Sequence, residues 1–127
     1  MLQNLQSNIR EITVTRDEVL AKTNDKCGYC GKNLQGVKWH IDHIEPMHRG
    51  RDDIGGNDSN KNKMASCVRC NLWKKTFSVD EFRNEIELQP SRLLKNSAQF
   101  RLAFRYDAVV ITDKPVIFYF ESMNLGN

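Results

Sequence analysis

The sequence predicts an α+β fold in which short strands and several helices surround a two-stranded core that is stabilised by a metal site. All four cysteines fall into two C-x-x-C pairs. Residues 37–44 are rich in β-branched and aromatic side chains, as is typical of a strand. In the C-terminal half, apolar side chains recur at helical intervals. The length of 127 residues fits one domain, which we take as residues 1–127.

The N-terminal part is predicted to contain a short strand over residues 12–14 followed by a helix. Thr15 is a suitable N-cap for this helix, and Glu18 can complete a capping box ahead of an apolar pair. Asn24 and Asp25 are expected to end it, because both residues favour turns.

The segment between the cysteine pairs is predicted to form a hairpin. The strand over residues 37–44 ends before Pro46, and a long polar loop covers residues 45–61. Loops of this length inside a small domain are usually functional or disordered. Residues 64–66 then return as the second strand, and a helix starts within residues 67–75.

The C-terminal part is predicted to contain two helices and a strand pair. A capping box formed by Ser78 and Glu81 starts the first helix. Pro90 is expected to separate it from a second helix, because proline lacks the backbone donor that a helix interior needs. The remaining predicted elements are a helix over residues 91–106 and strands over residues 109–111 and 116–120.

Composition indicates an intracellular protein that is not bound to a membrane. The mean hydropathy is −0.60, and no apolar run approaches the ~20 residues that span a bilayer. Residues 1–10 are polar and lack the apolar segment of a secretory signal. We therefore expect a cytoplasmic, non-secreted protein.

The net charge of +3 is small, but the cations are unevenly distributed. Two stretches contain cations and no acidic residue: residues 61–75 hold Lys61, Lys63, Arg69, Lys74 and Lys75, and residues 92–105 hold Arg92, Lys95, Arg101 and Arg105. Basic stretches suit a nucleic-acid backbone, whose binding depends on Lys and Arg. Solvated helix faces would explain them equally well.

The cysteine pairs predict a structural zinc site formed by Cys27, Cys30, Cys67 and Cys70. Four thiolates satisfy tetrahedral Zn²⁺, and a two-residue spacer lets one turn present two sulfurs to the same ion. A reducing compartment argues against disulfides, and duplication of the pair argues against a redox dithiol. A Cys₄ shell leaves zinc no open position, so any catalysis must take place elsewhere.

The residues between the pairs carry a second pattern. It comprises the sequence WHIDHIEP over residues 39–46, a glycine pair at 55–56, Asn62, Asn71 directly after Cys70, and then Lys74. With the cysteines, this pattern resembles the HNH endonuclease family over about residues 27–75, with residues 78–127 as an extension. The resemblance implies a ββα-metal core, also called the His-Me finger, and hydrolysis of DNA phosphodiester bonds.

The resemblance also implies roles for the residues of the pattern. His43 would be the general base, because an imidazole can accept a proton from water near neutral pH. Asp42 and Asn71 would hold one catalytic Mg²⁺ or Mn²⁺, which prefer oxygen ligands. Many family members carry His where this chain carries Asn71, which leaves the metal preference open. Asn62 would hold the loop backbone and thereby the base.

The basic residues around this pattern are candidates for nucleic-acid contacts. Those expected to hold flanking phosphates are Lys61, Lys63, Lys74 and Lys75. His40 shares a strand face with Asp42 and could contact phosphate, although a structural hydrogen bond explains it better. Trp39 and Trp73 are expected in the core.

Two alternatives stay open from the sequence. The first is a non-catalytic zinc-ribbon module that only binds nucleic acid, which would have no need of the Asp42, His43, Asn62 and Asn71 set. The second concerns assembly: Phe118 and Phe120 on the predicted terminal strands could pair with another copy. Such a homodimer would cut both DNA strands, whereas a monomer would more naturally nick one.

Overall fold

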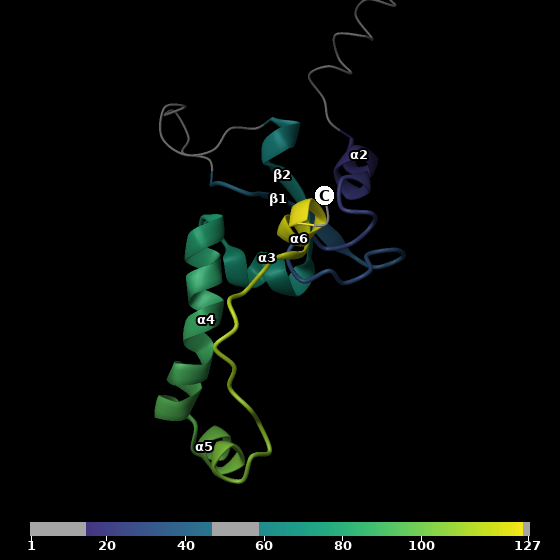
Figure 1. Ribbon diagram of the computed structural model, residues 1–127. Helices are drawn as coiled ribbons and strands as arrows, with labels where there is room; N and C mark the ends of the chain where they lie inside the picture. The colour runs from purple at the N-terminus through teal and green to yellow at the C-terminus, as the bar shows by residue number, and fades with distance from the viewer. Residues whose placement is uncertain (1–14, 47–58, 126–127) are drawn as a thin grey trace, which may run out of the picture.

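The computed structural model describes residues 15–46 and 59–125 (Figure 1). The elements in chain order are α2 (Arg16–Ala21), β1 (Trp39–His43), the short 3₁₀ helix η1 (Asn60–Asn62), β2 (Lys63–Cys67), α3 (Val68–Lys74), α4 (Val79–Asn96), α5 (Ala98–Arg105) and α6 (Tyr119–Leu125). The predicted strand over residues 12–14 and most of the predicted polar loop lie outside the described residues.

Strands β1 and β2 form an antiparallel hairpin that leads directly into α3. Trp39 lies opposite Cys67 at one end, and His43 lies opposite Lys63 at the other. Cys67 ends β2 and is the N-cap of α3, because its Sγ accepts a hydrogen bond from the Cys70 amide at 3.3 Å. The strand–strand–helix order predicted from the sequence is therefore confirmed, with β1 shorter than the predicted strand over 37–44.

The two predicted N-caps are also confirmed. Thr15 accepts a hydrogen bond from the Glu18 amide and starts α2. Ser78 and Glu81 form a complete capping box at the start of α4, each side chain bonding the backbone of the other residue. Such caps satisfy amide groups that the first turn of a helix cannot pair internally.

The prediction that Pro90 ends the first C-terminal helix is wrong, because α4 continues through Pro90 to Asn96. Pro90 lacks a backbone donor and crowds the carbonyl of Ile86, but neither effect ends the helix here. The break comes at Ser97, whose hydroxyl accepts a hydrogen bond from the Phe100 amide and caps α5. The guanidinium of Arg101 then donates to two carbonyls at the end of α4, those of Leu94 and Lys95, both at 2.9 Å.

The predicted strand pair near the C-terminus is wrong as well. Residues 109–118 contain no strand, and residues 119–125 form α6. The helix starts here because the Glu121 carboxylate accepts a hydrogen bond from the Phe118 amide at 2.9 Å. The next two amides donate to carbonyls of the first cysteine loop, at Tyr29 and Gly28. The predicted dimer contact through strands therefore loses its structural basis.

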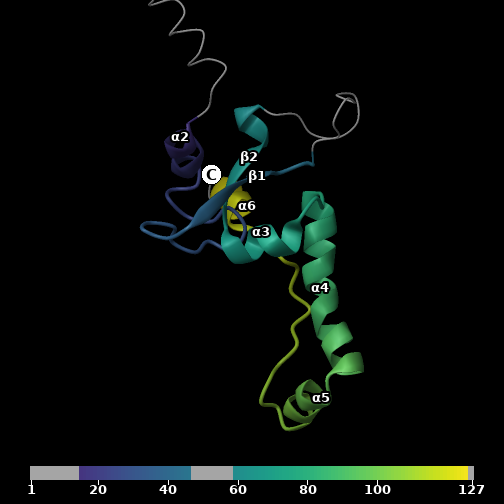
Figure 2. The same cartoon turned by 180° about the vertical axis from the view of Figure 1, so that it is seen from behind.

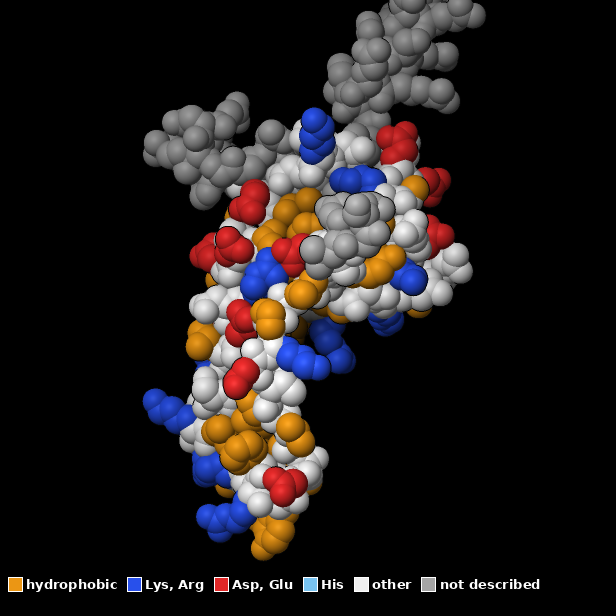
Figure 3. Space-filling view, in the orientation of Figure 1, with side chains coloured by type: hydrophobic (Ala, Val, Ile, Leu, Met, Phe, Trp, Pro, Cys, Tyr) orange, Lys and Arg blue, Asp and Glu red, His pale blue; other side chains and the backbone are white. Residues whose placement is uncertain are grey.

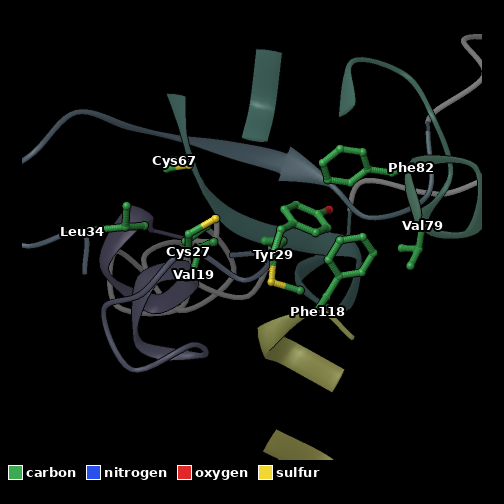
Figure 4. Close-up of a cluster of buried hydrophobic side chains, with 10 residues drawn as sticks. Val19, Cys27, Tyr29, Leu34, Cys67, Val79, Phe82 and Phe118 are labelled. Atoms are coloured by element: carbon green, nitrogen blue, oxygen red, sulfur yellow. The ribbon is translucent and has the colours of Figure 1, made fainter. Parts of the chain in front are cut away.

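The core lies between the hairpin, the first cysteine loop, α4 and α6, and its centre is aromatic. Figure 4 shows the Tyr29 ring beside those of Phe82 and Phe118. It meets both edge-on, with centroid distances of 5.5 and 5.2 Å, while Phe82 and Phe118 stack at 5.3 Å. Trp39 packs against this core as predicted, but Trp73 is 56% exposed and does not.

Beyond the core, the second half of α4 and α5 project as an arm, which we define as residues 88–113. Both ribbon views show it pointing away from the hairpin (Figures 1 and 2). Apolar side chains gather on its surface in Figure 3. The exposed apolar residues of the arm include Leu102, Tyr106 and Val110. None of the described helices combines the length and the apolar character needed to cross a bilayer.

Candidate active site and metal centre

The four cysteines converge from three parts of the chain. Cys27 and Cys30 lie in the loop before β1, Cys67 ends β2, and Cys70 lies in the first turn of α3. All four Sγ atoms lie within 4.8 Å of one another, and those of Cys30 and Cys67 are 3.8 Å apart. Sulfurs bound at ~2.3 Å around tetrahedral zinc lie about 3.8 Å apart. The donor set therefore fits structural Zn²⁺.

The protonation of this cluster also favours a cation. A hydrogen bond from the Cys70 thiol lowers the pKa of Cys27 to about 4, and the same bond raises the pKa of Cys70. Burial raises the pKa of Cys30. The thiols of Cys27 and Cys70 thus share a proton, and a divalent cation bound by the thiolates would take the place of that proton.

The first cysteine loop is docked closely on β2. The Gly28 amide donates to the Ala65 carbonyl at 2.8 Å. The Met64 sulfur lies only 2.0 Å from the position that a Cβ on Gly28 would take, so a larger residue would displace that side chain. Gly31 follows with a φ of 79°, a backbone conformation that favours glycine. These contacts fix the loop against the strand that leads to Cys67.

Asp42 and His43 lie at the end of β1, on opposite faces of the strand. The Asp42 carboxylate is buried at 6% exposure, and its Oδ2 accepts a hydrogen bond from the Tyr29 hydroxyl. The Lys74 ammonium of α3 pairs with the same Oδ2 at 3.0 Å. Lys74 also donates to the His43 carbonyl at 2.8 Å, so one side chain contacts both predicted catalytic positions.

Asn62 bonds the backbone just beyond His43 with both ends of its carboxamide. Its Oδ1 accepts from the Glu45 amide at 2.9 Å, and its Nδ2 donates to the Glu45 carbonyl at 3.0 Å. The Asn62 carbonyl also accepts from the Ile44 amide at 2.8 Å. These three bonds tie the chain leaving β1 to the chain entering β2, next to the position of His43.

Asn71 lies in α3, half-buried, directly after Cys70. Lys74 follows it at the i+3 position, and side chains with this spacing share one helix face. Because Lys74 reaches Asp42, this face of α3 is turned toward the end of β1. The helix that carries Cys70 therefore has Asn71 one turn before Lys74, next to the face that meets the end of β1.

The predicted phosphate contacts differ in their placement. Lys61 and Lys75 are exposed at the two ends of the β2–α3 segment, and Lys63 is half-buried opposite His43. Lys74 has 0% exposure, so the expectation that it holds a flanking phosphate is wrong. His40 is half-buried opposite Ser66 in the hairpin.

Tyr29 is the residue that the sequence did not single out. It lies between the first two cysteines, is 3% exposed, and reaches Asp42 with its hydroxyl. Burial, followed by the charge of Asp42, raises the pKa of Tyr29, so the hydroxyl stays protonated and acts as a donor. Its position inside a C-x-x-C loop was the signal that could have drawn attention to it.

Comparison with known proteins bears on this site. Residues 27–77 match the family model described as HNH endonuclease. No curated protein and no solved structure matched the chain. The matched segment contains both cysteine pairs, the hairpin and α3, so the resemblance and the ββα-metal fold class predicted from the sequence are confirmed.

Proposed function

We propose that this chain, whose residues 27–77 match the HNH endonuclease family model, is a metal-dependent endonuclease that hydrolyses DNA phosphodiester bonds. The observation that carries the proposal is the contact of α3 with the end of β1. Through Lys74, it sets the helix that bears Asn71 against Asp42 and His43. A protein that only bound nucleic acid would not need these groups in one place.

Zinc would organise this site without taking part in the reaction. Its four sulfur ligands come from the loop before β1, from the end of β2 and from α3. A complete thiolate shell excludes a bound water, so the ion acts through structure. Its ligation would hold α3 at a set position relative to the hairpin.

A catalytic Mg²⁺ or Mn²⁺ would be held by Asp42 and Asn71. Carboxylate and carboxamide oxygens are the hard donors that both ions prefer. Within the described part of the chain, both contacts of the Asp42 carboxylate fall on Oδ2, which leaves Oδ1 for an ion. When bound, the ion supplies charge stabilisation at the phosphoryl group and at the departing oxygen.

The remaining steps belong to side chains of this domain. His43 accepts the proton of the attacking water, and Asn62 holds the backbone that follows His43. By the family resemblance, the products carry 5′-phosphate and 3′-hydroxyl ends. Lys61, Lys63 and Lys75 would contact flanking phosphates by charge attraction.

The alternative function is a non-catalytic zinc ribbon that only binds nucleic acid. Trp73 gives this reading some support, because an exposed aromatic ring on α3 suits base stacking. The two functions differ in one measurable property. The binder retains DNA without breaking it, whereas the nuclease converts supercoiled DNA to nicked or linear forms in the presence of Mg²⁺ or Mn²⁺.

The test is incubation of the zinc-loaded protein with supercoiled plasmid, with and without Mg²⁺ or Mn²⁺. We expect cleavage only with added metal, and its loss in His43→Ala while zinc content and DNA affinity stay near those of wild type. Val37→Ala, on the surface two residues before β1, is the matched control and should cleave normally. DNA binding by the wild-type protein without cleavage in either metal would favour the zinc-ribbon module.

A further inference from the structure

The Asp42 carboxylate is held by residues from two of the three segments that carry the cysteines. Tyr29 comes from the loop that carries Cys27 and Cys30, and Lys74 comes from the helix that carries Cys70. Both groups act on the same oxygen, Oδ2, through the Tyr29 hydroxyl and the Lys74 ammonium. The loop that carries the first cysteine pair and the helix that carries Cys70 therefore both contact this carboxylate.

The Tyr29 hydroxyl has little freedom to move. The ring packs edge-on against Phe82 of α4 and Phe118 at the start of α6 (Figure 4). The Tyr29 carbonyl accepts a hydrogen bond from the Tyr119 amide at 3.0 Å. Because the ring and the backbone are both fixed, the hydroxyl is a rigid donor rather than a side chain that follows Asp42.

A rigid donor on one oxygen sets the orientation of the whole carboxylate. A carboxylate that binds a metal is usually oriented by hydrogen bonds from neighbouring groups, which fix its rotamer before the ion arrives. Here the bond from Tyr29 and the ion pair with Lys74 both engage Oδ2 and so restrict rotation of the group. The opposite oxygen, Oδ1, is then the one presented to a ligand.

We propose that Tyr29 is a positioning residue, which orients Asp42 for the catalytic divalent ion through the hydrogen bond to Oδ2. This inference rests on the proposed function, since it concerns the same ion. It adds a role for the cysteine loop beyond zinc binding. It also links the C-terminal segment at Phe118 and Tyr119 to the ion site, since both contact Tyr29.

The test is Mn²⁺ titration of the zinc-loaded protein without DNA, followed by electron paramagnetic resonance. Tyr29→Phe removes only the hydroxyl and should raise the Kd for Mn²⁺ by about tenfold, the lower end of effects seen for such outer groups. Zinc content and circular dichroism should match wild type. In DNA cleavage at saturating Mn²⁺, kcat should fall while KM for DNA stays unchanged.

Tyr119→Phe is the matched control, because its hydroxyl lies beside Asn24 at 3.4 Å and not at Asp42. It should leave Mn²⁺ affinity unchanged. Equal Kd values for wild type and Tyr29→Phe, or loss of zinc or folding in Tyr29→Phe, would overturn the proposal. A wild-type protein that binds Mn²⁺ but cleaves no DNA would contradict the proposed function alone, and the comparison of affinities would still decide the role of Tyr29.

Discussion

The core around the four cysteines and the C-terminal arm of residues 88–113 are each stabilised by a different kind of contact. In the core, partners lie far apart in the sequence, as with Tyr29 and Phe118 or Asp42 and Lys74. In the arm, they lie within one or two helical turns, as with the Arg101 guanidinium and the carbonyls of Leu94 and Lys95, both at 2.9 Å. Contacts between residues close in the sequence stabilise the arm, whereas the core depends on contacts between segments that are far apart in the sequence.

This difference follows from what each region buries. The core places aromatic rings and a charged pair out of solvent, and its cysteines fit an ion that links three segments. The arm leaves Leu102 60% and Tyr106 74% exposed. A change in the core should therefore spread to the candidate active site, and a change in the arm should remain local.

The largest effect is expected from loss of the zinc site. Apparent binding energies for structural zinc, on the order of 10–16 kcal/mol, are as large as the whole stability of a typical domain. Cys67→Ser should therefore abolish zinc binding at stoichiometric metal and the cooperative unfolding of the core. Zinc content and the dispersion of amide signals in NMR spectra would check this. A chelated protein with unchanged core signals would contradict it.

The second largest effect is expected from loss of the buried ion pair between Lys74 and Asp42. Lys74→Met removes an ammonium that has 0% exposure and leaves the Asp42 carboxylate without its charged partner. Removing one member of a buried pair costs about 3–5 kcal/mol. Urea unfolding at saturating zinc measures this loss. Lys95→Met on the exposed arm is the control and should change stability by less than about 0.5 kcal/mol. Similar losses in both variants would remove the distinction between the regions.

A smaller effect is expected where the C-terminal segment joins the core. Arg83 of α4 donates to Glu121 at 2.6 and 2.8 Å and to the Val116 carbonyl at 2.6 Å. Arg83→Met should lower the free energy of unfolding by about 2 kcal/mol, the range for hydrogen bonds to charged groups. Denaturant unfolding at saturating zinc would show it.

The stability contributed by the ion pair between Arg83 and Glu121 should also depend on pH. The hydrogen bonds from Arg83 lower the pKa of Glu121 below its ordinary value. A depressed folded-state pKa contributes stability that is present above the ordinary glutamate pKa and is lost as the pH falls through the lowered one. The difference between wild type and Arg83→Met should thus shrink as the pH falls below about 4.5. A difference that grows in acid would contradict this account.

The features that could be predicted from the sequence are those with local signals. The cysteine spacing, the capping box at Ser78 and the residue pair Asp42–His43 each occupy a few neighbouring positions. Helix caps form within one turn, so the residues that start α2 and α4 could be identified directly. The hairpin followed from the apolar strand and from the return to the second cysteine pair.

The features that could not be predicted depend on distant partners. Lys74 looked like a phosphate contact because nothing local shows that its helix face meets Asp42. The β-branched and aromatic residues around Phe118 suggested a strand. The backbone there forms a helix because carbonyls of Gly28 and Tyr29 accept its first amides. Tertiary partners of this kind override local propensity.

The smallest effect is expected from removal of a helix cap, which can be compared between two matched caps, one in each region. Ser78 caps α4 next to the core, and Ser97 caps α5 in the arm. Ser78→Ala should lower the global free energy of unfolding by about 1 kcal/mol. Ser97→Ala should destabilise α5 by a similar amount. This loss should appear only as faster amide exchange in α5, without a change in the global free energy of unfolding, because the arm has few contacts with the core. Amide hydrogen exchange with denaturant unfolding separates the two results, and a global loss from Ser97→Ala would show that arm and core unfold as one unit.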